Sequence, residues 1–330
     1  MSIKFLIYIF FANFLFFYFF QKISEKLKIY SFSTFKDGQI NKKTPLIGGF
    51  YILLNFNAYF FLDFVLPHIN SNYDIIAILL LSNIFFILGY IDDRINLGPY
   101  TKLFLFLFLS IFLLNFFEYL LITELKFSFL KTIIKLNQYS LIFTIFSIFV
   151  FINAFNMFDG INGHSGIYAI FVFIVFFMIS KNIIFIFFLI PFLIFLFLNL
   201  NEQFFIGNSG IFFLGLFISL IMISFYNNEY IIYSDDIFLI MFLPGIDLIR
   251  LFFIRVINKK NPFDRDLNHW HHILSNKFGN KRTLLISALF ISLPFTISIL
   301  NILSNILIIL LSLFIYIYII LFCKNLIKIN

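Results

Sequence analysis

The chain has 330 residues, of which 62% are hydrophobic and only 12% are charged. A globular domain in water carries roughly 45–50% apolar and about 25% charged residues, so this composition excludes a soluble enzyme, a nucleic-acid-binding domain and a disordered chain. The net charge of +7 comes from short basic blocks between apolar runs, a pattern typical of membrane orientation. The single cysteine, Cys323, excludes an internal disulfide and a cysteine-rich zinc site. The sequence predicts an integral membrane protein.

The apolar runs predict transmembrane helices, because one helical crossing of a bilayer needs about 20 residues. Eleven spans are expected, near 5–20, 45–67, 74–91, 101–122, 139–157, 166–180, 182–200, 210–226, 236–253, 283–301 and 304–323. No small-residue cleavage site follows the first span, so a retained helix is expected there and not a removed signal peptide. The expected fold is an all-α, polytopic integral membrane protein with 10–11 transmembrane helices in a single domain over residues 1–330.

Lysine and arginine residues predict the orientation of these helices. Seventeen of the 23 basic residues lie in the odd-numbered connections and the C-terminal tail, whereas five lie in the even-numbered connections and the N-terminal tail. Because cytoplasmic loops are enriched in basic residues, this bias predicts an N-terminus outside and odd-numbered connections in the cytoplasm. Lys126, Lys131 and Lys135 lie in an even-numbered connection and violate the rule, which suggests an interfacial segment there.

Four polar clusters interrupt the apolar sequence, and all four fall in odd-numbered connections. They are 92–94 (Asp-Asp-Arg), 153–163, 207–210 (Gly-Asn-Ser-Gly) and 264–272. Lys43 lies in the first connection, on the same predicted face. Random placement would put four clusters on one face only about one time in eight, so the pattern favours a single cytoplasmic site.

Two of the clusters contain carboxylates. Asp92 and Asp93 end the third predicted helix, where they serve either as helix terminators or as a site for Mg²⁺ or a proton acceptor. Asn153, Asn156 and Asp159 recur every third residue, so they point into one cavity from one half of a helix. A purely structural alternative is that the asparagines bond a neighbouring helix. The glycines that follow break the helix and allow a ligand to approach the backbone closely.

The other two clusters favour phosphate binding. Backbone N–H groups at 207–210 open a predicted helix and can hold phosphate, although a plain turn is the alternative. The last cluster contains three of the five histidines, His269, His271 and His272, after the basic residue Arg265. A zinc site is the alternative, but adjacent histidines cannot both face one metal on a regular helix, and a cationic loop of donors fits phosphate better. Asp247 and Arg250, three residues apart, are interpreted as a structural pair with a site role as the alternative.

Together these motifs resemble the polyprenyl-phosphate N-acetylhexosamine-1-phosphate transferase family, in the same superfamily as the phospho-MurNAc-pentapeptide transferase. The resemblance rests on Lys43-Thr44-Pro45 with Gly48-Gly49, on 89–94 (Gly-Tyr-Ile-Asp-Asp-Arg), on 153–163, and on His-x-His-His at 269–272. Order and spacing agree across about 230 residues. The family is described as having ten or eleven transmembrane helices and a cytoplasmic site.

The resemblance implies transfer of an N-acetylhexosamine 1-phosphate from a UDP-sugar to undecaprenyl (polyprenyl) phosphate. The transfer would depend on Mg²⁺, with Mn²⁺ as an alternative, and would release UMP and start a lipid-linked glycan such as O-antigen of lipopolysaccharide. The implied partners are the UDP-N-acetylhexosamine, the lipid phosphate and the bilayer, with no nucleic acid and, by family analogy, a second copy in a homodimer. The implied location is the bacterial inner (plasma) membrane, with the active site on the cytoplasmic face.

The resemblance also implies roles for individual residues. The expected catalytic residues are Asp92, Asp93 and Asp159. The expected substrate-binding residues are Lys43, Lys102, Asn153, Asn156, Arg265, His269, His271 and His272. The expected magnesium ligands are Asn156, Asp159 and Asn208.

Two positions depart from the family pattern. Asn162 stands where the family often has the second Asp of Asp-Gly-x-Asp-Gly, and Asn208 stands where it usually has a metal-binding Asp. An amide oxygen binds Mg²⁺ without a charge, so a lower affinity is expected. One alternative is therefore a family member that has lost catalysis and serves as a scaffold. Another is a secondary transporter, although the repeat symmetry and midplane acids of transporters do not appear in this sequence.

Overall fold

The structure, a computed structural model, describes residues 40–65, 73–261 and 268–327 together with most of residues 13–34. Its long helices are α2 (Gly48–Val65), α3 (Tyr73–Ile95), α4 (Pro99–Phe116), α5 (Ser140–Phe158), α6 (His164–Ser180), α7 (Ile184–Leu200), α8 (Gly207–Asn227), α10 (Phe242–Ile257), α12 (Asn280–Ile299) and α13 (Asn305–Ile327). Shorter helices are α9 (Ser234–Ile240), α11 (Trp270–Phe278), η1 (Glu118–Leu120) and η2 (Asn137–Tyr139). Two antiparallel pairs complete the fold, β1 (Tyr30–Thr34) with β2 (Ile40–Pro45) and β3 (Glu124–Leu125) with β4 (Ile134–Lys135).

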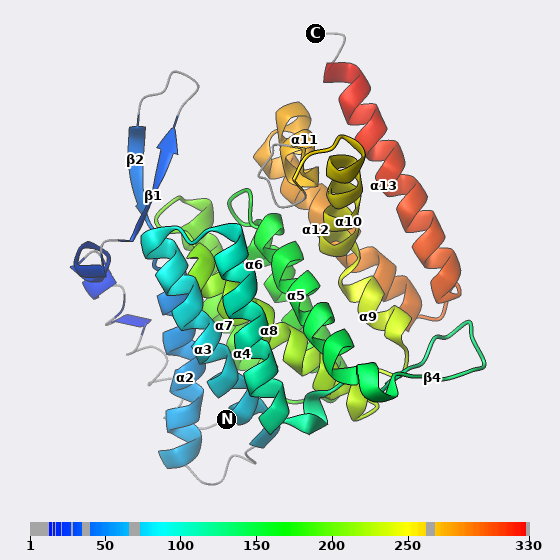
Figure 1. The fold of residues 1–330 in the computed structure, drawn as a ribbon. Helices are drawn as coiled ribbons and strands as arrows, with labels where there is room; N and C mark the ends of the chain where they lie inside the picture. The colour runs from blue at the N-terminus through cyan, green and yellow to red at the C-terminus, as the bar shows by residue number, and fades with distance from the viewer. Residues whose placement is uncertain are drawn as a thin grey trace.

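This arrangement confirms the predicted all-α, polytopic membrane class (Figure 1). Among the described residues, six helices are long and apolar enough to cross a membrane, and the bent pair of α9 and α10 adds a seventh. The helices α6 and α7 are apolar but shorter, with 17 residues each. The break between α6 and α7 and that between α12 and α13 confirm the predicted divisions of two long apolar runs. The expected span 5–20 lies largely outside the described residues.

The expected span at 236–253 is broken in the structure, because the chain bends by 84° between α9 and α10. Met241 stands at the break with a backbone φ of −92° and ψ of 5°. Pro244 lies in the first turn of α10, where it cannot donate an N–H and its ring would clash with the carbonyl of residue 240 in a continuous helix. Pro244 is compatible with the first turn of α10 but not with the interior of one continuous helix, which explains why α9 and α10 are separate helices.

Helix α8 forms the centre of the bundle. Every side chain in its most apolar 18-residue stretch is buried, which explains why this sequence is apolar on all sides. Beside it, the ring of Phe56 in α2 stacks on Phe188 of α7 with a centroid separation of 3.9 Å. The same ring makes edge-to-face contacts with Phe213 and Phe217 of α8. Aromatic contacts of this kind add about 0.5–1.5 kcal/mol each beyond area burial, so they hold α2 and α7 against α8.

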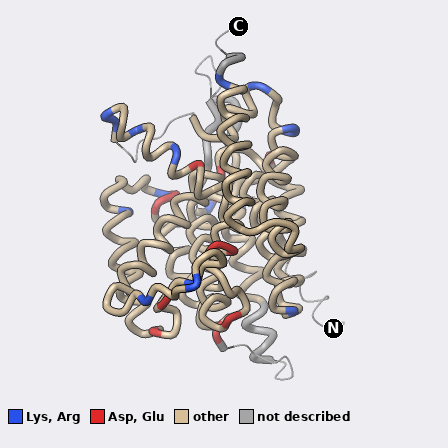
Figure 2. Tube along the Cα trace, turned by 90° about the vertical axis from the view of Figure 1, so that its right-hand side faces the viewer, with Lys and Arg blue, Asp and Glu red and all other residues tan. Residues whose placement is uncertain are grey.

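The two ends of the bundle differ in their connections and charge. The β1–β2 hairpin and α11 lie at one end, and β4 lies at the other (Figure 1). Figure 2 shows more Lys and Arg segments toward the end that carries α11 than toward the opposite end. The end with α11 therefore corresponds to the face that the basic residues predict to be cytoplasmic.

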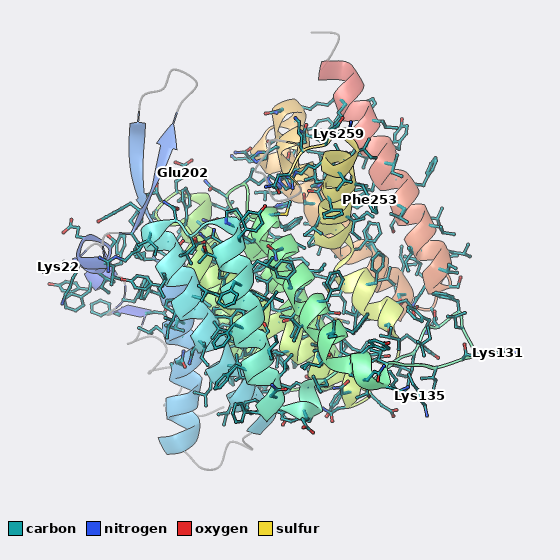
Figure 3. All side chains as sticks on the ribbon, viewed as in Figure 1. Lys22, Lys131, Lys135, Glu202, Phe253 and Lys259 are labelled. Carbon is teal, nitrogen blue, oxygen red and sulfur yellow. The ribbon has the colours of Figure 1, made fainter. Side chains whose placement is uncertain are left out.

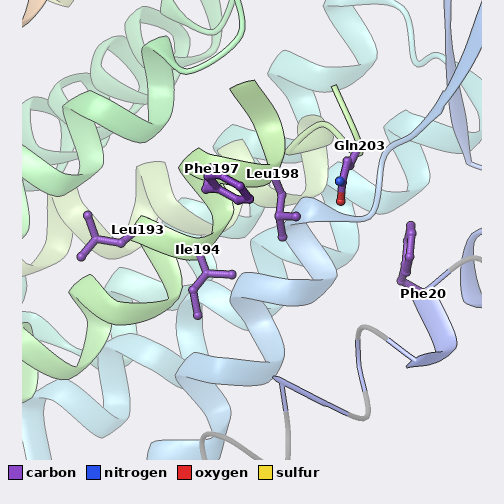
Figure 4. Close-up of a pocket in the computed structure, with 6 residues that line it drawn as sticks. All are labelled: Phe20, Leu193, Ile194, Phe197, Leu198 and Gln203. Carbon is purple, nitrogen blue, oxygen red and sulfur yellow. The ribbon is translucent and has the colours of Figure 1, made fainter. Parts of the chain in front are cut away.

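An apolar groove of about 500 Å³ opens beside the second half of α7 (Figure 4). Its lining residues are Phe20, Leu193, Ile194, Phe197, Leu198 and Gln203. Only Gln203 brings a polar side chain to this groove. The groove therefore offers little to bind a charged substrate, and the polar groups of the protein gather elsewhere.

Candidate active site

The first part of the site forms where the end of α3 meets the start of α8. One carboxylate oxygen of Asp93 accepts the backbone N–H of Asn208 at 2.8 Å, and the other accepts the N–H of Ser209 at 3.0 Å. These N–H groups lie in the first turn of α8, where they have no partner inside the helix. The start of α8 thus binds the carboxylate of Asp93 in the way that helix starts bind anions.

Asp92 is fully buried and has a partner on each carboxylate oxygen. Its Oδ1 accepts the backbone N–H of Leu97 at 2.9 Å, which closes the turn after α3. Its Oδ2 accepts the side-chain amide of Asn208 at 2.8 Å and forms an ion pair with Lys102 Nζ at 2.7 Å. A buried carboxylate is costly unless it is paired and hydrogen-bonded, so Lys102 and Asn208 are the groups that allow Asp92 to be buried here.

Glycines allow three helices to meet at this point. A Cβ added to Gly89 of α3 would lie 2.4 Å from the backbone oxygen of Asn208. One added to Gly49 of α2 would lie 2.5 Å from the backbone nitrogen of Gly210. Side chains at these positions would separate the helices and remove Asp93 from the start of α8, which gives a physical reason for the glycines on either side of the site.

The end of α5 supplies the second part of the site. Asp159 follows the last residue of α5 and accepts the hydroxyl of Ser165. Burial raises the pKa of Asp159 to about 7, the hydroxyl of Ser165 opposes this rise, and the nearby charge of Asp93 adds to it. Because the charge of Asp93 affects the pKa of Asp159, the carboxylates at the ends of α3 and α5 are close enough to interact electrostatically. Asn156 lies on the same side of α5, three residues earlier, and is half-buried.

A tight turn connects Asp159 to α6. Gly163 has a φ of +86°, a left-handed conformation that glycine adopts without strain. Its N–H donates to Oδ1 of Asn199 at 2.6 Å, and the amide of Asn199 donates to the carbonyl of Phe204 at 3.2 Å. Asn199 of α7 thereby links the turn after α5 to the segment before α8.

The third part of the site is a group of histidines that packs against this turn. A Cβ added to Gly160 would lie 1.8 Å from Nε2 of His271, so the ring of His271 occupies the space that a side chain at 160 would need. The ring centroids of His271 lie 5.5 Å from His269 and 4.3 Å from His272. The predicted His-x-His-His group therefore meets the turn that follows Asp159.

A fourth histidine, His164, joins the group. Its ring centroid lies 5.3 Å from that of His271, and its Nδ1 donates to the carbonyl of Phe158 at 2.7 Å. Since Nδ1 carries the proton, Nε2 of neutral His164 is an acceptor. Burial lowers the pKa of His164 to about 4 and also lowers the pKa of His271. Both rings are therefore neutral near pH 7.

Asp247 holds the histidine segment in place. Its carboxylate accepts Nδ1 of His269 at 3.2 Å and the backbone N–H of Trp270 at 3.2 Å. The same group pairs with Arg250 at 2.7 Å and accepts the hydroxyl of Tyr316 at 2.6 Å. The interpretation of Asp247 and Arg250 as a structural pair agrees with these contacts, and the pair positions the histidines through α11.

The structure thus brings together most of the predicted site residues. The group contains Asp92, Asp93, Lys102, Asp159, Asn208, His269, His271 and His272. Asn156 lies in the last turn of α5, just before Asp159. Asn153 lies on the same helix, but its amide donates back to the carbonyl of Phe149. Arg265 and the side chain of Lys43 lie outside the described residues. Sequence reasoning missed His164, Ser165 and Asn199, and proximity to the 153–163 cluster was the available signal for the first two.

The donor groups suit a hard cation such as Mg²⁺. Each oxygen of Asp93 accepts one N–H, and Asp159 accepts one hydroxyl, so both carboxylates keep lone pairs. Within the described part of the chain, no three His, Cys, Asp or Glu residues are grouped to hold a metal by themselves. Mg²⁺ is commonly bound by one or two carboxylates and completed by water and substrate phosphates. This donor set fits that kind of site.

The sequence relatives agree with the motifs of this site. Residues 75–226 match glycosyl transferase family 4. Over 86 residues the chain is 36% identical to the undecaprenyl-phosphate alpha-N-acetylglucosaminyl 1-phosphate transferase of Thermotoga maritima. That alignment covers 26% of this chain and 28% of the relative's length. The matched segment includes Asp92, Asp93, Asp159 and Asn208, so the similarity to glycosyl transferase family 4 covers the carboxylates of this site.

Proposed function

We propose that the protein transfers an N-acetylhexosamine 1-phosphate from a UDP-sugar to undecaprenyl (polyprenyl) phosphate. The observation that supports this proposal most strongly is the grouping of the site's carboxylates. Asp92 and Asp93 contact the start of α8, and Asp159 is close to Asp93 and precedes Gly160, which packs against His271. A site of carboxylates, backbone N–H groups and histidines at a helix end suits a lipid-bound acceptor and a water-soluble polyanionic donor. The relative from Thermotoga maritima, named as an undecaprenyl-phosphate alpha-N-acetylglucosaminyl 1-phosphate transferase, supports the sugar-phosphate transfer to the lipid phosphate.

The reaction is a phosphoryl transfer. An oxygen of the polyprenyl phosphate forms a bond to the phosphorus that carries the sugar, and the bond from this phosphorus to the UMP oxygen breaks. UMP leaves, and the polyprenyl-diphospho-sugar remains in the bilayer. Because the second pKa of a phosphate monoester is about 6, the acceptor is mostly a dianion at neutral pH and needs little help from a base. The protein therefore contributes mainly positioning and charge neutralisation.

Each part of the site has a role in this proposal. Asp93 is placed beside the acceptor phosphate by the N–H groups of α8, and Asp92 is held with Lys102 next to it. Asn153 and Asn156 line the nucleotide side. The histidines His269, His271 and His272, together with Arg265 and Lys43, donate to the phosphates of the two substrates. Lys102 is placed to meet a phosphate oxygen as well as Asp92.

Magnesium is part of the proposal, with Mn²⁺ as an alternative. Asp159 and the amide oxygens of Asn156 and Asn208 would hold the ion, which would neutralise charge on the transferred phosphoryl group. Since Asn208 brings no negative charge, we expect weaker Mg²⁺ binding than a carboxylate at this position would give.

We further propose that the protein resides in the bacterial inner membrane with this site on the cytoplasmic face. The concentration of basic residues at the end with α11 supports this orientation (Figure 2), and nucleotide sugars are cytoplasmic metabolites. The product would start a lipid-linked glycan such as O-antigen, and the enzyme would work as a homodimer by analogy with its family.

The test is incubation of the purified protein with Mg²⁺, radiolabelled UDP-N-acetylhexosamines and polyprenyl phosphate. The proposal predicts release of UMP only when the lipid phosphate is present, together with a lipid diphospho-sugar detected by mass spectrometry. The hydrogen bond from Asn208 to Asp92, where the family usually has a second acid, favours the alternative of a non-catalytic scaffold. Absence of UMP release with every UDP-N-acetylhexosamine would support that alternative.

A further inference from the structure

The connection between α4 and α5 contains a hairpin, residues 124–135, that the proposed activity does not use. Its strands pair Glu124 with Lys135 and Leu125 with Ile134. It extends sideways from the helices at the end opposite α11 (Figure 1). Such a projection needs an explanation, because a hairpin of two short strands is marginally stable by itself.

The base of the hairpin is fixed to the helices by polar contacts. The backbone N–H of Lys126 donates to Oη of Tyr226 at 2.7 Å, and its carbonyl accepts the N–H of Ser234 at 2.7 Å. The backbone N–H and the hydroxyl of Ser128 both donate to the buried carboxylate of Asp235, at 2.8 Å and 2.6 Å. The hairpin is therefore anchored to α8 and α9 and presents its outer residues in a defined direction.

Beyond this base, the hairpin exposes large apolar side chains. Phe129, Leu130, Ile133 and Ile134 are 44–50% exposed. Ser128 of the hairpin and Asn305 at the start of α13 both bond to Asp235, so the two segments lie close together. Leu307 and Leu310 of α13 are exposed to a similar degree. Apolar residues in this position bury themselves in the boundary between headgroups and acyl chains. The exposed apolar surface of the helices thus continues into the hairpin.

The lysines of the hairpin fall into two classes. Lys126 forms ion pairs with Glu124 at 2.9 Å and Glu229 at 3.1 Å. Lys131 and Lys135 are exposed and form no ion pair within the described parts of the chain. Figure 3 shows both lysines at the opposite end from Lys259, with Lys131 at the outer tip. Two ammonium groups beside exposed apolar residues match the phosphates of an anionic lipid surface.

We propose that the hairpin lies in the membrane interface opposite the active site, where Lys131 and Lys135 bind the phosphates of anionic phospholipids. The occupant is a lipid surface and not a second protein, because the apolar residues continue the lipid-facing side of α13 and the two free charges are both positive. This binding explains why Lys131 and Lys135 remain on this face, whereas Lys126 is accounted for by its ion pairs with Glu124 and Glu229. The proposal is independent of the transferase activity.

The experiment uses one fluorophore on the hairpin of the full chain. Cys323 is buried and is the single cysteine, so Cys323→Ser gives a background in which Phe129→Cys carries an environment-sensitive dye. The protein is placed in nanodiscs of phosphatidylcholine and phosphatidylglycerol, with bromine on the acyl chains of one lipid at a time. Bromine quenches only nearby dyes. We expect quenching by both lipids, and quenching by brominated phosphatidylglycerol about twofold stronger at equal mole fraction.

Matched variants identify the lysines. Lys131→Gln with Lys135→Gln should abolish the preference for phosphatidylglycerol, whereas Lys181→Asn, which removes an exposed charge at the end of α6, should preserve it. Equal quenching by the two lipids in the parent protein would overturn headgroup recognition. An unquenched dye with emission typical of water would overturn membrane contact. An unquenched dye with emission typical of an apolar environment would also overturn it and favour another protein copy as the partner. A preference that survives the double substitution would remove the lysines from the proposal.

Discussion

The carboxylate of Asp93 accepts the backbone N–H of Asn208 at 2.8 Å, although 115 residues separate the two positions in the chain. A second bond from Ser209 engages the other oxygen. Two N–H groups that the helix cannot satisfy itself thus bind one negative charge. Asp93 therefore joins α3 to α8 in addition to its proposed role beside the acceptor phosphate.

Asp93→Asn should lower lipid-dependent UMP release by about 100-fold or more. Asn keeps one acceptor oxygen for α8, so the protein should fold, but it removes a carboxylate charge that would help to hold Mg²⁺ beside the acceptor phosphate. Asp74→Asn, at the other end of α3, is the control and should retain activity. Full activity of the Asp93 variant would exclude this residue from the site.

Asn208→Asp should lower the Mg²⁺ concentration needed for half-maximal rate. The substitution replaces the amide that donates to Asp92 with a third carboxylate. The carboxylates then repel one another more strongly when no cation is bound, and a bound Mg²⁺ relieves this repulsion, so the affinity for Mg²⁺ rises. Mg²⁺ should also raise the melting temperature of the variant more than that of the parent, which provides a measurement independent of activity. Asn201→Asp adds the same charge to an exposed connection and should change neither quantity. Identical Mg²⁺ titrations for parent and Asn208 variant would place the metal away from this side chain.

Gly160→Ala should reduce activity by about 100-fold, because small displacements in a site of this kind are costly. The new methyl group would lie 1.8 Å from Nε2 of His271 and must displace that ring. Gly245→Ala is the matched control, since its methyl group would meet no atom within 4 Å. The prediction fails if the two variants have the same UMP release.

His164→Asn should make the protein less sensitive to mild acid. Asn can donate to the carbonyl of Phe158 as Nδ1 of His164 does, but it does not titrate. Burial lowers the pKa of His164 from 6.5 to about 4 in the folded protein, so the unfolded chain binds a proton first as the pH falls below 6.5. This difference costs the folded parent protein about 2 kcal/mol between pH 7 and pH 5. Melting temperatures at the two pH values should fall further for the parent than for the variant, and equal losses would contradict the prediction.

The sequence predicted the parts of the site that carry charge. Asp92, Asp93 and the histidines were identifiable because charged and polar residues at the ends of apolar helices are expensive and therefore conspicuous. The spacing of Asn156 and Asp159 placed both on one side of a predicted helix, whereas in the structure Asn156 lies in the last turn of α5 and Asp159 directly follows that helix. The divisions between α6 and α7 and between α12 and α13 followed from short polar stretches in the same way.

The remaining features depend on contacts between distant segments. The bend at Met241 was not predicted, because Pro244 is compatible with a helix start as well as with a kink. His164 lies inside an apolar stretch, and only its contact with His271 from α11 reveals a place in the site. The central position of α8 was also hidden, since six of the described helices are long and apolar enough to cross a membrane.

The most direct test is the sidedness of two segments that the account places on one face. In a Cys323→Ser background, Tyr100→Cys reports on the connection after Asp92 and Asp93, and Lys259→Cys reports on the connection before the histidines; both residues are exposed. A membrane-impermeant maleimide should modify both positions only from the cytoplasmic side, whereas Lys131→Cys should react from the outside. Modification of Tyr100→Cys and Lys259→Cys from opposite sides of the membrane would contradict a single site built from α3, α5, α8 and α11.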